Sequence, residues 1–405
     1  MWFLLLACDG SDPQTEDPGD GVERLTSNTT DTPPDDPRTS DELFTQDVIH
    51  TVDITLDDDA WDGLYVDPYT FVSGDVRVDG DLVPGSGVRL RGKYGSFRTI
   101  TGKPKFKIAF DEYDGAQRYL GMKALALNNE VVDCSFLKEP LGYEVFRTAG
   151  IPVPRTSFAS VTVNGEDYGL YVLVEVPDDV FLERHYADAS GNLYDGKYLY
   201  FPGYGSGYTL LDFASGLDDQ FPLEEGTDVD NVDVSAVSSV IVDGTAAGTY
   251  TDTVGALVDL PYFHHYEAAE QWIGHVDGYA LNQNNYRFYF DPQGKMQFIP
   301  WDFDYAFYQD YEWGMSWENP RGKLAAGCWA NPDCRADQAE AVRALADAVD
   351  PDALIATFDA WDALTIELAQ DDPRRECRRG QVPGSRDALR DWVRSRNEAV
   401  VASWD

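Results

Sequence analysis

The segment His275–Asp304 carries two groups of side chains that could hold a metal ion and accept a proton. Asp277 is followed by Asn282, Asn284 and Asn285, and the segment ends with Asp302 and Asp304. Carboxylates and carboxamides that converge at one point form an all-oxygen site of the kind that Mg²⁺ prefers. In a protein this acidic, two surface turns rich in Asp and Asn are the competing interpretation.

A predicted β-hairpin separates the two groups. Tyr286–Phe290 alternates as a strand, Asp291–Gly294 forms a turn, and Lys295–Trp301 returns as a second strand. Because a hairpin brings the chain back to its own start, we expect Asp302 to lie close to Asp277. The surrounding aromatic residues indicate burial and favour a site over two surface turns; they are Trp272, Tyr279, Tyr286, Phe298, Trp301 and Phe303.

A basic strand is predicted far upstream, after the glycine-bearing loop Gly92–Ser96. Within it, Lys105 and Lys107 share one face, while Phe106, Ile108 and Phe110 share the other. A basic face over an apolar one suits a strand that faces phosphate groups. It suits a solvent-exposed edge strand equally well, and these residues alone do not separate the two interpretations.

Length and charge limit the possible partners. A chain of 405 residues is long enough for one large domain or two lobes. Its net charge of -41 repels nucleic acid and anionic lipid headgroups, so we expect neither as a partner. A polyanionic ligand such as a nucleotide would need a local basic patch or a metal ion. No stretch is long and apolar enough to span a bilayer, and we expect a monomer.

The first residues resemble a bacterial lipoprotein signal. Leu5-Leu6-Ala7-Cys8 matches a lipobox, although the apolar run before it is short and no Lys or Arg precedes it. We expect residues 1–8 to form a signal segment whose Cys8 is lipidated. Residues 9–42 are rich in Asp, Pro, Thr and Ser, and they predict a solvated tether. The chain would then be an exported lipoprotein, anchored in the periplasm or at the cell surface.

Four further cysteines suggest disulfides in an exported protein; they are Cys134, Cys328, Cys334 and Cys377. Cys328 and Cys334 flank a short loop and are the expected pair. A zinc site would require CxxC spacing and nearby histidines, which the sequence lacks, so we favour the disulfide.

The order of predicted elements is a β-rich half followed by a mostly helical half with a central hairpin. Strands are predicted from Val48 onward, with hairpin turns at Asp79-Gly80 and Asn164-Gly165. Asp133 is the expected N-cap of a helix that Pro140 kinks or delays. The acidic stretch Leu223–Val234 predicts loops or an insertion. Helices are predicted over Tyr262–Trp272, Gln338–Val349, Pro351–Leu368 and Ser385–Ser403. The fold class is therefore α+β.

In this order, several short motifs resemble the CotH family, which comprises spore-coat protein H and its relatives. The motifs are Val88-Arg89-Leu90-Arg91-Gly92, Lys105-Phe106-Lys107, Asn164-Gly165 with Tyr168-Gly169-Leu170-Tyr171 and Glu175, Asp277-Gly278-Tyr279 with Asn285-Tyr286, and Ile299-Pro300-Trp301-Asp302-Phe303-Asp304. The resemblance covers about residues 48–405. It implies a bilobal, atypical protein-kinase-like fold over residues 43–405, with an N-lobe of about 43–176 and a C-lobe of about 177–405.

The resemblance also implies roles for the polar residues of the opening segment. Asp277 would be the catalytic base, and His275-Val276-Asp277 repeats the His-x-Asp spacing of kinases. Asp302 would bind Mg²⁺ or Mn²⁺, with Asp304 as a possible second ligand. The metal-binding asparagine would be Asn282, five residues after Asp277, or alternatively Asn285.

The β-rich half would supply the nucleotide contacts. Lys105 or Lys107 would contact the phosphates of ATP, and the loop with Gly95 and Ser96 would close over them. Glu175 would lie at the hinge beside the adenine. The expected partner of the strand lysine is Glu139, with Glu144 as the alternative because Pro140 disturbs the helix.

Three functions compete on this basis. The first is an ATP-dependent protein kinase that phosphorylates Ser or Thr of exported or surface proteins. The second is a catalytically silent kinase-like module that serves as a structural or binding protein on the cell surface. The third is a carbohydrate- or calcium-binding surface domain, which would not require the basic strand. Because Asp277 and Asp302 are both present, the sequence favours the kinase.

Overall fold

The computed structural model describes residues 38–404, apart from 94, 197–198, 201–207 and 309–313. The expected signal segment with Cys8 and nearly all of the expected tether lie outside these residues. The fold begins with α1 (Ser40–Leu43), close to the predicted start of the domain. Residues 39–405 form one compact unit.

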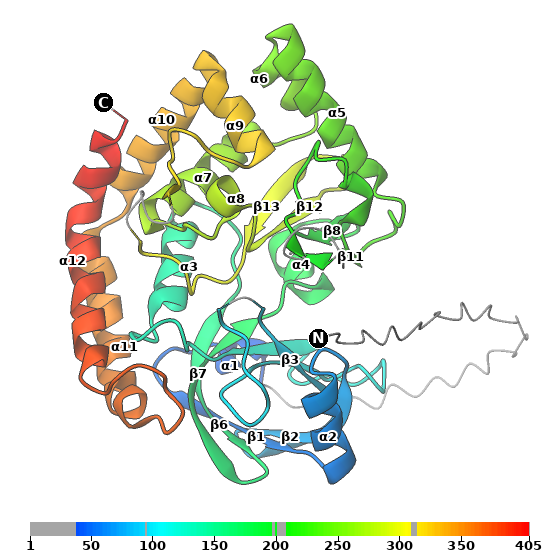
Figure 1. The fold of residues 1–405 in the computed structure, drawn as a ribbon, viewed down its shortest axis with the longest axis vertical. Helices are drawn as coiled ribbons and strands as arrows, with labels where there is room; N and C mark the ends of the chain where they lie inside the picture. Colours follow the sequence, from blue (N-terminus) through cyan, green and yellow to red (C-terminus); the bar gives the residue numbers. More distant parts are fainter. Residues whose placement is uncertain (1–37, 94, 197–198, 201–207, 309–313, 405) are drawn as a thin grey trace, which may run out of the picture. The chain divides into compact units, whose positions relative to one another are not determined.

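The β-rich half is a closed barrel of seven strands (Figure 1). The strands are β1 (Ile49–Thr55), β2 (Val72–Val78), β3 (Asp81–Arg91), β4 (Lys105–Ala109), β5 (Ala124–Asn128), β6 (Thr156–Val163) and β7 (Glu166–Glu175). Their order around the barrel is β1-β2-β3-β4-β5-β7-β6. Only the β1–β6 pair is parallel, and α2 (Asp58–Val66) connects β1 to β2.

Both predicted barrel hairpins are present. Asp79-Gly80 joins β2 to β3, and Asn164-Gly165 joins β6 to β7. All four turn residues have positive φ, which Asn, Asp and Gly tolerate better than other residues. These turns fix the strand registers that place the barrel's inward and outward side chains.

Strand β4 has the two chemically distinct faces that its sequence predicts. Phe106 and Ile108 are completely buried in the barrel core. Lys105 and Lys107 point to the opposite face. Because β4 pairs with both β3 and β5, it is not an edge strand. Lys105 on the basic face contacts Asp302 and Asp304 of the second half of the chain, and Lys107 lines a cavity.

Helix α3 (Lys138–Thr148) begins five residues later than its expected cap. The carboxylate of Asp133 accepts hydrogen bonds from the backbone N–H groups of Ser135, Leu137 and Lys138. Asp133 thus organises the turn that leads into the helix. Pro140 occupies the first helical turn, where its missing N–H has no intrahelical partner to lose. The proline delays the helix, as predicted, and does not kink it.

The second half combines helices with a four-stranded sheet of order β11-β8-β12-β13. The sheet strands are β8 (Asn192–Asp195), β11 (Leu223–Glu225), β12 (Tyr286–Phe290) and β13 (Met296–Pro300), and β9 (Leu199–Tyr200) pairs with β10 (Tyr208–Thr209). The helices are α4 (Asp179–His185), η1 (Asp218–Gln220), α5 (Val232–Ala247), α6 (Tyr250–Val254), α7 (Leu260–Ile273), α8 (Tyr279–Asn282), α9 (Lys323–Ala330), α10 (Pro332–Ala348), α11 (Pro351–Asp371) and α12 (Gln381–Ala402).

The mixed α+β class and the β12–β13 hairpin agree with the sequence, but two predictions differ. The acidic stretch expected as loops contains β11 and leads into α5, whose apolar residues Val234, Val237 and Ile241 are buried. The burial of these apolar residues therefore favours regular structure in this stretch despite its acidic composition. Strand β5 was not predicted, because its five residues are buried on both faces and do not alternate.

The expected disulfide between Cys328 and Cys334 is present. Cys134 and Cys377, by contrast, are free thiols. Among the helices of the described residues, none is both long and apolar enough to cross a membrane.

Candidate active site

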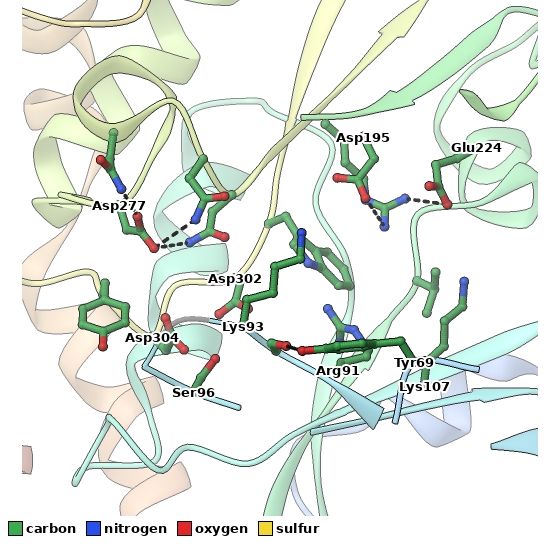
Figure 2. A pocket seen from close by; sticks show the side chains of 18 of the residues that line it. Tyr69, Arg91, Lys93, Ser96, Lys107, Asp195, Glu224, Asp277, Asp302 and Asp304 are labelled. Atoms are coloured by element: carbon green, nitrogen blue, oxygen red, sulfur yellow. Dashed lines mark hydrogen bonds and ion pairs between the residues drawn. The ribbon is translucent and has the colours of Figure 1, made fainter. Parts of the chain in front are cut away.

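A cavity of about 680 Å³ lies where the basic face of the barrel meets the β12–β13 hairpin (Figure 2). Strands β3 and β4 and the loop after β3 line one wall. The segments that follow α7 and β13 line the other. Of the residues predicted to form the site, Ser96, Lys107, Asp277, Asn282, Asn285, Asp302 and Asp304 line this cavity.

Lys105 connects the two walls. Its ammonium donates to both oxygens of Asp302, at 2.9 and 2.7 Å, and to Oδ2 of Asp304 at 3.0 Å. The lysine side chain is 1% exposed and the Asp302 side chain 14%. Three charged groups that sequence reasoning placed in two different halves of the chain therefore form one buried cluster.

The two carboxylates that share Lys105 differ in the direction in which their pKa values are shifted. Burial disfavours ionisation of Asp302, but the adjacent Lys105 outweighs it and lowers the pKa of Asp302. Burial and the charge of Asp302 raise the pKa of Asp304 to about 7. Asp302 also has a positive φ of 54°, which is unusual for a non-glycine residue and typical of residues held in place at functional sites.

Asp277 is held by three asparagine side chains. The Nδ2 groups of Asn282, Asn284 and Asn285 donate to its carboxylate at 2.5, 3.1 and 3.0 Å. Burial raises the pKa of Asp277, while these amides favour its charged form. Asn285 has a positive φ of 52° and so turns back toward Asp277. The asparagines therefore orient a carboxylate that is a stronger base than an exposed aspartate.

The donor set of this cavity fits a hard divalent cation. The asparagines use their N–H groups on Asp277, and Asn282 and Asn285 also carry carboxamide oxygens that line the cavity with Asp302 and Asp304. Such neutral and charged oxygens are the ligands that Mg²⁺ prefers. Within the described part of the chain, the carboxylates of Asp277, Asp302 and Asp304 do not bring three oxygens within 4.8 Å of one another. Asparagine oxygens and further oxygen ligands would thus be needed to complete the coordination.

Glu139 lies behind the cavity and does not line it. Its Oε2 accepts a 2.6 Å hydrogen bond from Asn128, and its Oε1 accepts one from Tyr143. Burial and then the charge of Asp302 raise the pKa of Glu139 to about 7. The ammonium of Lys105 bonds to Asp302 and Asp304 instead, so the expected Lys105–Glu139 ion pair is not formed. Glu144, the alternative partner, pairs with Arg147.

The loop after β3 approaches the other wall closely. Gly95 has φ of 88°, and a Cβ atom at this position would lie 2.2 Å from the hydroxyl of Tyr305. The positive φ therefore favours glycine, and a larger residue would also displace the Tyr305 side chain. Ser96 lines the cavity beside it, and the carbonyl of Ser96 accepts a hydrogen bond from the buried Asn129. The loop is thus fixed at the edge of the cavity.

Glu175 is placed differently from its expected position beside a ligand. Its carboxylate pairs with Arg155, at 2.8 Å, and with Arg184. Its side chain is 2% exposed and does not line the cavity, whereas the next residue, Val176, does. The side chain of Glu175 thus secures the connection between β7 and α4. At this point in the chain it is Val176, and not the side chain of Glu175, that adjoins the cavity.

Several cavity residues were not predicted as site residues, notably Arg89, Arg91, Arg287 and Trp301. The guanidinium groups of Arg91 and Arg287 lie over the Trp301 ring, at 4.8 and 5.1 Å from its centroid. A signal for the strand arginines existed in the sequence. Arg89 and Arg91 alternate as Lys105 and Lys107 do, which predicts a second basic face. Which strands would be neighbours was not readable from that pattern.

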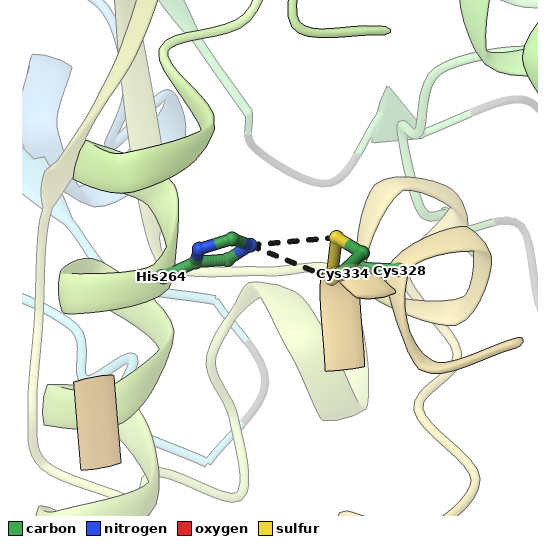
Figure 3. Close-up of side chains that lie close together, drawn as sticks. All are labelled: His264, Cys328 and Cys334. Atoms are coloured by element: carbon green, nitrogen blue, oxygen red, sulfur yellow. Dashed lines mark hydrogen bonds between the residues drawn. A yellow bond between two sulfur atoms is a disulfide. The ribbon is translucent and has the colours of Figure 1, made fainter. Parts of the chain in front are cut away.

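A second group of potential metal ligands surrounds the disulfide (Figure 3). Nε2 of His264 lies 3.4 Å from Sγ of Cys334 and 3.6 Å from Sγ of Cys328. Both sulfur atoms are bonded to each other, so neither offers a thiolate to a metal ion. This group is a structural contact of α7 with α9 and α10, which contain Cys328 and Cys334.

Comparisons with known proteins agree on a family. Residues 88–400 match the family model described as CotH kinase protein. Inner spore coat protein H of Bacillus subtilis (strain 168) is 24% identical over 213 residues, which cover 51% of this chain and 56% of that protein. This chain thus spans little more than half the length of that relative.

A structural match was also found to a Shewanella oneidensis MR-1 structure, a complex of the toxin antitoxin system HipA and HipB with its operator DNA. The match has a TM-score of 0.31 and 13% sequence identity, and it covers 77% of this chain and 68% of the matched chain.

Proposed function

This chain belongs to the CotH kinase protein family, and we propose that it transfers the γ-phosphoryl group of ATP to Ser or Thr hydroxyls of exported or surface proteins. On this proposal the barrel is the N-lobe of a kinase-like fold, and the helical half is the C-lobe. ATP and Mg²⁺ or Mn²⁺ occupy the cavity between them.

The observation that carries the proposal is the cluster of Lys105, Asp302 and Asp304 beside Asp277. Phosphoryl transfer requires cationic groups near the phosphates, a carboxylate that holds a metal ion, and a carboxylate that accepts the hydroxyl proton. One candidate for each role is present: Asp277 and Asp302 line the cavity, and Lys105 bonds to Asp302 beside it. Neither a calcium-binding surface loop nor a carbohydrate-binding face needs this combination.

Asp277 accepts the proton of the acceptor hydroxyl. The amides of Asn282 and Asn284 fix its orientation, and burial strengthens it as a base. A base in this position needs its carboxylate ionised before the hydroxyl arrives. The three amide hydrogen bonds favour the ionised form.

Lys105 and Asp302 position the nucleotide. A divalent cation held by Asp302, with Asn282 or Asn285, would neutralise the phosphate charge that builds up during transfer. The ammonium of Lys105 is shared between Asp302 and Asp304, and it can turn toward a phosphate oxygen when Asp302 engages the cation. Ser96 lies at the edge of the cavity, on the loop after β3, and would contact the phosphates from that side.

The proposal extends to location and oligomeric state. We propose an exported, monomeric protein that is anchored by a lipid on Cys8 and held away from the membrane by the tether of residues 9–42. The printed name of the Bacillus subtilis relative, a spore coat protein, supports export. Mass analysis of the mature N-terminus in the native host tests the anchor, and an unmodified Met1 would exclude it.

A phosphotransfer assay with γ-labelled ATP tests the activity. The full-length protein is incubated with candidate exported proteins, with Mg²⁺ or Mn²⁺, and with EDTA as control. We expect label on Ser or Thr only when a divalent cation is present. Metal-dependent ATP binding without transfer to any substrate or to itself would instead favour the catalytically silent, structural alternative.

A further inference from the structure

The cavity has a second charged end, away from Asp277. Arg89, Lys107 and Arg287 line it, and these three residues are called the cationic end below. In Figure 2, Lys107 lies on the opposite side of the view from Asp277 and Asp304. Two carboxylates, Asp195 and Glu224, line the same region, but each lies 4.0 Å from Arg287, the outer limit for an ion pair.

The fold forces like charges together at this end. The register of β3 and β4 places Arg89 directly opposite Lys107, and Arg91 opposite Lys105. Like charges directly opposite each other on neighbouring strands are destabilising. Lys105 is compensated by Asp302 and Asp304. For Lys107 and Arg89, no carboxylate within ion-pair distance is present in the described part of the chain.

The polar atoms of the cationic end are also incompletely hydrogen-bonded. Within the described residues, the ammonium of Lys107 has no hydrogen-bond acceptor. Arg287 is 7% exposed and donates from Nη1 to the carbonyl of Pro177, while its Nε is buried without a partner. Burial and the neighbouring Arg287 and Arg89 lower the pKa of Lys107 to about 8. Lys107 and Arg89 are half-buried. Removing a cation from water without a close counterion is costly, and an anionic ligand would offset that cost.

We propose that Arg89, Lys107 and Arg287 form a subsite that binds a phosphate-class oxyanion directly, without a divalent cation. The two guanidinium groups and the ammonium group are donors of the kind that bind phosphate oxygens. This subsite differs from the Asp302 end, where carboxylates predominate and a phosphate needs a metal ion. The two ends would therefore hold anionic groups by different means within one cavity.

The inference deepens the proposed function but does not depend on catalysis. The oxyanion has two possible sources. It is part of the polyphosphate chain of the nucleotide, or it is a separate inorganic phosphate. Either source would supply an anion to the cationic end, and the experiment below distinguishes the two.

The test is calorimetric titration of the full-length protein with inorganic phosphate in buffer that contains EDTA. We expect binding in the absence of divalent cations. Lys107→Met keeps the side-chain length and removes the charge, so it should weaken phosphate binding at least about tenfold. Arg77→Met is the matched control, because Arg77 lies on the exposed face of β2 and its guanidinium donates to the carbonyl of Gly80. No binding in EDTA, or equal effects of the two variants, would overturn the proposal.

Thermal unfolding separates a binding role from a structural one. Because Lys107 is repelled by its neighbours, Lys107→Met should unfold at a higher temperature than the wild type without ligand. Saturating phosphate should raise the melting temperature of the wild type and leave that of the variant unchanged. A lower melting temperature in the variant, together with unchanged phosphate affinity, would mark Lys107 as a structural residue and refute the subsite.

Competition identifies the source of the oxyanion. In EDTA, ATP should displace phosphate if the nucleotide's polyphosphate occupies the subsite, whereas adenosine should not. If ATP fails to displace bound phosphate, the ligand is the separate oxyanion. These measurements need no phosphoryl transfer. A failed phosphotransfer assay therefore leaves the subsite standing, and an active kinase without phosphate binding in EDTA would remove only the subsite.

Discussion

The ammonium of Lys105 lies 2.7 Å from Oδ2 of Asp302, although 197 positions separate the two residues in the chain. Lys105 comes from β4 of the barrel, and Asp302 lies two residues after β13 in the helical half. The pair therefore joins the two walls of the cavity. Because both groups are largely removed from water, each depends on the other to remain charged.

Loss of Lys105 should be strongly destabilising. Lys105→Met leaves the carboxylates of Asp302 and Asp304 buried without their counterion, and we expect a loss of about 3–5 kcal/mol in the free energy of unfolding. Urea unfolding at neutral pH measures it. The control is Lys123→Met, which removes a more exposed lysine paired with Asp179 and should cost less than about 1 kcal/mol. Similar losses in both variants would contradict the central role of the Lys105 cluster.

Asp302→Ala should remove the metal-dependent part of ATP binding. Asp302 is the carboxylate that Lys105 keeps ionised, so it is the principal anionic ligand available to a cation. Titration calorimetry with ATP in Mg²⁺ and in EDTA should show a gain in affinity from the metal in the wild type and none in the variant. Asp252→Ala, on the surface of α6, serves as the control. An undiminished metal effect in Asp302→Ala would exclude Asp302 as a ligand.

Asp277→Asn should separate binding from transfer. The amide keeps the size of the side chain but cannot accept the hydroxyl proton, so the rate of phosphoryl transfer should fall by about 10²–10⁴. ATP affinity in Mg²⁺ should change little, because Asp277 is directed at the acceptor. Single-turnover transfer and calorimetry measure the two quantities. Persistent transfer in the variant would show that another group accepts the proton.

Stability should fall as pH rises through the range in which Asp304 ionises. An aspartate titrates at about 3.8 when exposed, whereas burial and Asp302 raise the pKa of Asp304 to about 7 in the fold. Between these values the folded state binds more protons than the unfolded state, so each increase in pH lowers stability. Urea unfolding in EDTA should show a smaller decline from about pH 4 to pH 7 in Asp304→Asn than in the wild type. Identical slopes would mean that folding does not raise the pKa of Asp304.

The disulfide should contribute modestly to stability. Cys328 and Cys334 are six positions apart, and closing so short a loop restricts the unfolded chain by about 2 kcal/mol. Replacing both cysteines by alanine should lower the melting temperature and abolish the effect of added reductant. If reductant destabilised the double variant as much as the wild type, the effect would arise elsewhere in the chain.

The sequence by itself determined the local features of this protein. Alternating residues fixed the two faces of β4, and the Asp-Gly and Asn-Gly turns fixed two barrel hairpins. The hairpin after Asn285 indicated that the acidic group at its end returns to the region of Asp277. These features depend on neighbours along the chain, and so a pattern of residue types is enough to predict them.

Tertiary structure decided which charges meet. Lys105 could be distinguished from Lys107 only once the barrel was closed against the second half, because both share one strand face. Closure gave Lys105 two carboxylates and left Lys107 opposite Arg89. It also turned Glu175 toward Arg155 and Arg184, away from the cavity. Ion pairing and burial depend on distances between residues far apart in the chain, and sequence spacing does not encode those distances.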